Sequence, residues 1–108
     1  MITVVDDYAP CIALRRAVFI EEQGISEAEE MDDLDESAIH MLATVDGQPA
    51  GTARLLLQDD IGKIGRICVL SDYRGTGLGA RIVEAAMDHL RTLPNIKRAK
   101  LGSQDHAI

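Results

Sequence analysis

The sequence has no tryptophan and only three other aromatic residues, one phenylalanine and two tyrosines. A surface on which nucleic-acid bases stack is therefore not expected. Basic residues are also scarce, because eleven Lys and Arg stand against eighteen Asp and Glu, for a formal net charge of −7. Nucleic-acid-binding domains lean basic, so no nucleic-acid partner is expected. The acidic balance favours a cationic partner or serves solubility.

Cysteines and long apolar runs are few as well. Two cysteines cannot build a disulfide framework, and Cys11 and Cys68 fall in apolar segments that predict reduced core residues. No stretch is long and apolar enough to cross a bilayer, and no basic-then-apolar leader precedes the first apolar segment. We therefore expect one cytoplasmic domain over residues 1–108, with no membrane partner.

Apolar spacing predicts the element order β-α-βββ-α-β. The expected strands are 2–5, 39–45, 50–57, 63–70 and 96–102, and the expected helices are 9–22 and 80–91. Asp6 or Asp7 is expected to cap the first helix, and Gly24 to end it. The acidic run over 21–36 is typical of a solvated loop. Hairpins followed by one crossover predict an α/β (α+β) fold with a mixed, mostly antiparallel sheet and helices on both faces.

The most informative segment is the glycine-rich turn Arg74–Ala80, which lies between an expected strand and an expected helix. Glycines allow a ligand to approach the backbone closely, and the first amides of a helix lack partners within it, so this turn predicts an anion site. The Walker pattern fails because Ala80 and Arg81 stand where glycine and lysine are needed. The G-x-G-x-G spacing also misses the dinucleotide pattern. A tight strand–helix connection without a ligand is the structural alternative.

Arg74, Gly77 and Gly79 match the pattern Arg/Gln-x-x-Gly-x-Gly/Ala after a strand, which resembles the signature of the GNAT N-acetyltransferases. Two further blocks, 15–23 and 30–35 followed by His40, resemble the ElaA/YjcF-type subgroup. This resemblance implies transfer of an acetyl group from acetyl-CoA to a primary amine of a small molecule or peptide.

The same resemblance implies which residues hold acetyl-CoA. The turn would cradle the pyrophosphate, with Arg74 or Arg81 adding charge, and the preceding strand would pair with the pantetheine arm. Gln104 is either a contact of that arm or a polar residue at a strand end. The implied set is Ile67, Cys68, Val69, Arg74, Gly75, Thr76, Gly77, Leu78, Gly79, Ala80 and Gln104.

The catalytic groups remain open. Many family members carry a glutamate near the start of the strand where this chain has Gly65 and Arg66. The candidates that remain are Glu30, Asp32, Asp35 and His40. The three carboxylates form an ion-pair network with Arg15 and Arg54, attract a cationic amine, or act as a base. His40 is otherwise a packed strand histidine, and Cys68 a packing residue. No metal-ligand pattern is present.

The end of the sequence departs from the family pattern. A further helix and two strands are expected to be missing, including a tyrosine that protonates the leaving thiolate in many members. Strand 96–102 would then have an open edge, which allows a homodimer through that strand. Two alternatives follow: a truncated, non-catalytic CoA-binding domain, or an acyltransferase like the acyl-homoserine lactone synthases. The latter is suggested by Arg15, Phe19, Glu30, Asp32, Asp35 and Arg54.

Overall fold

One six-stranded sheet forms the centre of the computed structural model, which describes residues 1–30, 33–102 and 104–107. The strands follow the chain in the order β1-β2-β3-β4-β5-β6. All neighbours are antiparallel except β4 and β5. The strands are β1 (Ile2–Val5), β2 (Ile39–Val45), β3 (Gln48–Gln58), β4 (Ile61–Val69), β5 (Arg98–Leu101) and β6 (Gln104–Ala107).

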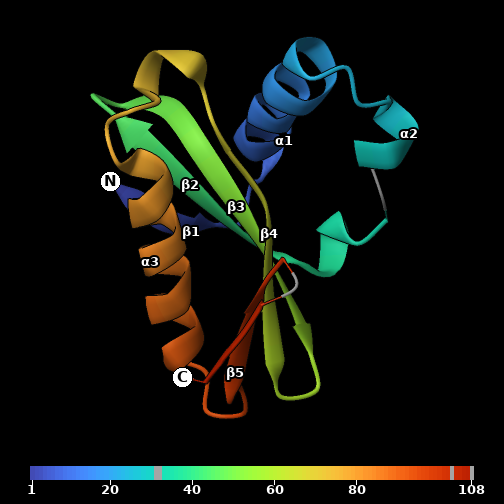
Figure 1. Cartoon of the computed structure of the whole chain (residues 1–108), viewed down its shortest axis with the longest axis vertical. Helices are drawn as coiled ribbons and strands as arrows, with labels where there is room; N and C mark the ends of the chain where they lie inside the picture. The colour runs from blue at the N-terminus through green and yellow to red at the C-terminus, as the bar shows by residue number, and fades with distance from the viewer. Residues whose placement is uncertain (31–32, 103, 108) are drawn as a thin grey trace.

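Helices cover both faces of the sheet (Figure 1). Helix α3 (Leu78–Arg91) is the crossover between β4 and β5, and its buried residues pack with alternate residues of the strands, such as Leu55 and Ile64. The other face receives α1 (Ala9–Arg15), whose Leu14 packs near Cys68. Because successive strand residues point to opposite faces, β3 is buried from both sides. The predicted mixed, mostly antiparallel fold is confirmed.

The connections between β1 and β2 contain four short helical segments. Helix α1 continues directly into a π-helix, η1 (Arg16–Glu22), so the predicted helical span is confirmed, although its wider second half was not foreseen. The amide of Ala9 donates to Asp7 Oδ1, and Gly24 follows the helix end with a φ of 73°. The remaining segments are α2 (Glu27–Glu30) and η2 (Asp35–Ser37), followed after β4 by η3 (Ser71–Tyr73).

The expectation of a solvated acidic loop over 21–36 is wrong at two positions. Glu30 and Asp35 are buried, with exposed fractions of 3% and 6%. Their burial is possible because buried arginines pair with them, which compensates the cost of removing a carboxylate from water. A linear pattern of charges could not show which carboxylates would meet those arginines.

Two strand predictions also need correction. Residues 61 and 62 belong to β4 and not to the turn, because Gln58 pairs with Ile61 across a two-residue turn. The strand expected to be last has no open edge, because Arg98–Leu101 pairs with β4 on one side and with β6 on the other. The strand at this edge of the sheet is therefore β6. The homodimer stays a prediction, and any pairing would use β6 in place of the strand originally expected.

The close packing of α3 on β4 leads to a stability prediction for Gly62. A Cβ atom added at Gly62 would lie 2.8 Å from Leu90 Cδ1, and Leu90 is fully buried in α3. We expect Gly62→Ala to lower the free energy of unfolding by about 1–3 kcal/mol, because inserting a methyl group into a packed core forces side chains or backbone to move. Urea denaturation measures this change. Gly65→Ala on the same strand is the control, since its Cβ would meet nothing within 4 Å; equal effects of the two substitutions would refute the packing explanation.

Candidate active site

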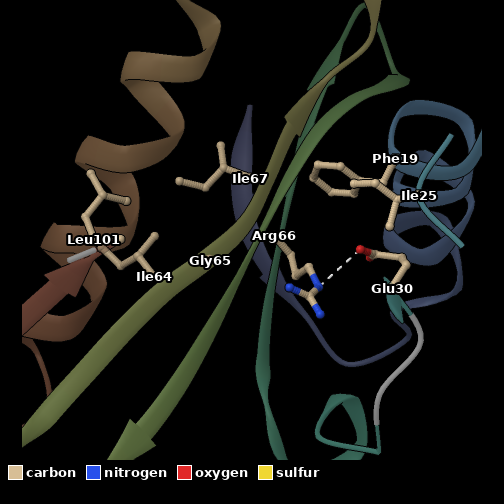
Figure 2. A pocket seen from close by; sticks show the side chains of 9 residues that line it. Phe19, Ile25, Glu30, Ile64, Gly65, Arg66, Ile67 and Leu101 are labelled. Atoms are coloured by element: carbon tan, nitrogen blue, oxygen red, sulfur yellow. Dashed lines mark ion pairs between the residues drawn. The ribbon is translucent and has the colours of Figure 1, made fainter. Parts of the chain in front are cut away.

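A cleft opens where β4 and β5 separate. The two strands pair from Ile61 to Ile64 and no further. Just beyond, β4 carries a bulge, because Arg54 pairs with Gly65 and Thr52 with Cys68, so that two residues of β4 oppose one of β3. Bulges bend the strand that carries them and increase its twist. The consequence is a cavity of about 510 Å³ lined by Phe19, Ile25, Glu30, Ile64, Gly65, Arg66, Ile67, Leu101 and Gly102 (Figure 2).

The open edge of β4 presents backbone amides to this cleft. The amide of Leu70 donates to Ala50 of β3 at 2.9 Å. Alternate residues of a strand direct their backbone N–H and C=O groups to the same side. The backbone groups of Cys68 therefore also point toward β3. The amides of Ile67 and Val69 therefore face the side on which β5 has ended. Such an edge can accept an extended, amide-containing ligand as an added strand.

The glycine turn forms a backbone cradle at the start of α3. Gly75 and Gly77 have φ values of 79° and 81°, a region that favours glycine. Gly77 caps the helix without any side-chain hydrogen bond. The first internal bond of the helix runs from the Arg81 amide to the Gly77 carbonyl. The amides of residues 78–80 therefore have no acceptor within the helix, and they point to a site that suits an anion.

All three nitrogen atoms of the Arg74 guanidinium group donate hydrogen bonds within the protein. Its Nε donates to the Val69 carbonyl at 2.9 Å, and its two Nη atoms donate to Glu22 Oε1 and Oε2 at 2.5 and 2.9 Å. The hydrogen bonds from Arg74 lower the pKa of Glu22, and Glu22 in turn raises the pKa of Arg74. Arg74 thus joins the end of η1 to the glycine turn, and its charge is already balanced by Glu22.

Two of the acidic candidates from the sequence, Glu30 and Asp35, take part in a buried ion-pair network. Arg15 Nε donates to Glu30 Oε1 at 2.5 Å, and Arg15 Nη1 donates to Asp35 Oδ1 at 2.8 Å. Arg54 Nη1 donates to the same Asp35 oxygen at 3.1 Å. This arrangement is the network with Arg15 and Arg54 that the sequence allowed. Four of the residues that suggested a lactone synthase, Arg15, Glu30, Asp35 and Arg54, thus have a structural role that does not require that activity.

Burial and pairing act in opposite directions on these groups. Burial disfavours the charged form of Asp35, but hydrogen bonds from Arg15 and Arg54 outweigh it and lower the pKa of Asp35. Burial likewise opposes the charge on Arg15, yet bonds to Asp35 and Glu30 raise its pKa. A carboxyl group held in its ionised form by two guanidinium groups is a weak proton acceptor. Asp35 therefore stabilises the fold and is not a candidate for the general base.

Glu30 is the only one of the described acidic candidates that also lines the cleft. Its Oε2 lies 3.2 Å from Arg66 Nε, and Figure 2 shows the two side chains meeting across the cavity from α2 and β4. Arg66 has a φ of 49°, which belongs to the bulge in β4. The arginine of the bulge thus lies in the part of the strand where, by the family resemblance, many members carry a glutamate.

The other predicted residues are spread over several places. His40 is buried on β2, stacks on Tyr8 with a centroid distance of 4.2 Å, and has its Nε2 2.8 Å from the Asp35 carbonyl. Burial raises the pKa of the Cys68 thiol to about 12, so it stays protonated and serves packing. Gln104 belongs to β6, but its side chain lies outside the described part, as does Asp32 entirely. Among the described residues, no group of His, Cys, Asp and Glu could hold a metal ion.

Comparison with known proteins decides the family. The model of the acetyltransferase (GNAT) family matches residues 8–108. The chain belongs to this family. It is an acyltransferase, and the family resemblance found in the sequence is confirmed. No described helix is both long enough and apolar enough to span a membrane.

This GNAT protein is also similar to individual proteins. YyaT of Bacillus subtilis is 37% identical over 109 residues, which cover 98% of this chain and 73% of YyaT. An acyl-CoA N-acyltransferase from Pseudomonas aeruginosa is 27% identical with a TM-score of 0.80, covering 94% of this chain and 75% of that one. ElaA of Escherichia coli is 25% identical with a TM-score of 0.77, covering 96% and 79%.

Three residues of the first helix and the segment after it contact the site in a way that the sequence did not predict. Phe19 was expected on the buried side of the first helix and in a family motif, Glu22 was expected only in the acidic run, and Ile25 was not singled out. Each lies in η1 or just after it, and at least 36 positions along the chain separate each of them from β4. The only signals in the sequence were Phe19 and the Glu21-Glu22 pair, which belong to the block 15–23. Neither signal indicates which residues of β4 or of the glycine turn they contact.

Proposed function

We propose that this protein transfers the acetyl group of acetyl-CoA to a primary amine of a small molecule or peptide. The observation that supports this most strongly is the continuity of two binding features along one segment. The open edge of β4, at Ile67 and Val69, leads within a few residues to the backbone cradle at 75–80. A molecule with a pyrophosphate at one end and an amide-containing arm at the other matches both features.

The residues present offer open space and backbone donors of the kind that acetyl-CoA would need. Gly75 and Gly77 leave open space where a Cβ would stand, so the pyrophosphate could approach the amides of residues 78–80. The amides of Ile67 and Val69 would pair with the pantetheine arm. Val69 contributes only its amide, because its carbonyl already accepts from Arg74. Arg81, near the start of α3, is the cation that remains near the cradle, since Arg74 is paired with Glu22.

The chemistry follows from the place where the arm would end. The reacting thioester would lie in the cleft beside the bulge at Arg66 and Ile67. A backbone amide of β4 would stabilise negative charge on the carbonyl oxygen as the amine nitrogen attacks. The N–C bond forms and the C–S bond breaks. One proton leaves the amine nitrogen and one reaches the thiolate, so the products are an acetamide and free CoA.

A titration and a thiol-release assay test this proposal together. We expect saturable binding of acetyl-CoA by calorimetry, and release of free thiol when an amine from a panel of polyamines, amino sugars and peptides is added. Binding without thiol release from any amine would favour the non-catalytic CoA-binding alternative. The absence of saturable binding would overturn the proposal. An acyl carrier protein donor that yields a lactone would favour the synthase-like alternative.

A further inference from the structure

The two oxygens of the Glu30 carboxylate have partners of different kinds. Oε1 is bound by Arg15, whose side chain is 1% exposed and which is fixed by Asp35 as well. Oε2 lies toward Arg66, whose side chain is 29% exposed and lines the cleft (Figure 2). One oxygen is therefore held within the core, and the other takes part in the wall of the cavity.

We propose that Glu30 Oε2 is the anchoring site for a cationic group of the acceptor, and that the Arg66 guanidinium occupies that site until the acceptor displaces it. This inference rests on the proposed acetyl transfer and specifies its acceptor. The site already holds a cation of the kind it would select. Exchange of one cation for another keeps the buried carboxylate paired at every stage, which avoids the cost of an uncompensated charge.

The position of the site defines the class of acceptor. Arg66 directly precedes Ile67, whose amide faces the cleft, so the Glu30 site lies beside the place proposed for the thioester. An amine must be neutral to attack, whereas a group bound to a carboxylate is charged. The two roles therefore fall to different nitrogens. The expected acceptor is an amine that carries a second cationic group, such as a diamine or an aminoalkylguanidine.

Apolar side chains in the cavity indicate that the two nitrogens of the acceptor are joined by an alkyl chain. Phe19 and Ile25 line the same cavity from the side of η1, next to Glu30 in Figure 2. A short alkyl chain between two nitrogens would contact these side chains, while its charged end reaches Glu30. A strongly polar acceptor such as an amino sugar would leave its hydroxyl groups against apolar surface, which is unfavourable.

Kinetics with matched acceptors test the anchoring role. Rates are measured with an α,ω-diamine and with the monoamine of the same chain length. In the unmodified protein we expect a lower KM for the diamine. In Glu30→Gln we expect this preference to fall by about tenfold or more, since a charge-assisted bond is lost. Affinity for acetyl-CoA, measured on the same variant, reports whether the site has otherwise kept its structure. An unchanged diamine preference would overturn the inference.

A binding experiment without turnover tests the role of Arg66. Arg66→Asn removes the guanidinium, and asparagine tolerates the positive φ at this position. We expect methylguanidinium to bind saturably to Arg66→Asn, and not to the double variant Arg66→Asn/Glu30→Gln. The diamine KM should also fall several-fold in Arg66→Asn. A rise in that KM would make Arg66 itself the acceptor contact and would refute displacement.

The two experiments separate this inference from the proposed function. Suppose that Arg66→Asn binds methylguanidinium but the unmodified protein transfers acetyl to no amine. This result would support the cation site at Glu30 and refute the proposed acetyl transfer. Transfer to amines without diamine preference, together with no methylguanidinium binding, would refute only the anchoring site.

Discussion

Replacing Gly77 with aspartate is expected to weaken acetyl-CoA binding by at least about 100-fold, or roughly 3 kcal/mol. Gly77 caps α3 with a φ of 81°, and a side chain there would enter the open space in front of the unpaired amides. A carboxylate at that point would bind the helix start itself and repel a pyrophosphate. Calorimetric titration measures the loss.

The matched variant Gly77→Asn separates charge from shape. Asparagine has the same size, and both residues tolerate the left-handed region, so the fold should persist in each. We expect the asparagine variant to bind more tightly than the aspartate variant. Gly47→Asp, in the β2–β3 turn with a φ of 79°, controls for a general effect of such substitutions. Undiminished acetyl-CoA affinity in Gly77→Asp would show that the pyrophosphate binds elsewhere.

Asp35→Asn is expected to lower the free energy of unfolding by about 3–5 kcal/mol, because it removes the counter-charge that two buried guanidinium groups share. Asp35 is buried and accepts hydrogen bonds from both Arg15 and Arg54. An amide group in its place would present a donor to one of these donors. A loss of this size is a large part of the stability of a typical domain. Urea or thermal denaturation measures it.

The control for this prediction is an ion pair of similar length at the surface. Arg16 Nη2 lies 2.6 Å from Glu27 Oε1, but both side chains are well exposed. We expect Glu27→Gln to leave the unfolding midpoint nearly unchanged, since exposed pairs contribute little. If Asp35→Asn were equally harmless, the buried network would not be needed for stability.

The pH dependence of stability gives a further check on Asp35. Its pKa is lowered in the folded protein, so its carboxylate stabilises the fold fully above the unfolded value of about 3.9, and this contribution is lost as the pH falls through the folded value. The difference in unfolding free energy between the unmodified protein and Asp35→Asn should therefore be constant from neutral pH to about pH 5. Below about pH 4 this difference in unfolding free energy should become smaller. A difference that grew with acidification would contradict the assignment.

The fold class and the position of the glycine turn before α3 follow from the sequence alone, because both depend on local patterns. Apolar periodicity gave the order of strands and helices up to β5, and the spacing of Arg74, Gly77 and Gly79 located the turn before α3. It did not predict β6, whose short segment offers little periodicity. The π-helical turns of η1 were equally hidden, since their apolar spacing differs little from that of an α-helix.

The tertiary structure decided how the charged residues are used. Glu30 and Asp35 lie in one acidic run, and no local pattern assigns them different roles. The fold brings Arg15 and Arg54 against Asp35, while the bulge in β4 brings Arg66 against Glu30 at the cleft. These pairs join residues 19 to 36 positions apart in the chain. The interaction of two charges depends on their distance and burial. Only the folded arrangement therefore separates a carboxylate that stabilises the core from one that faces the cavity.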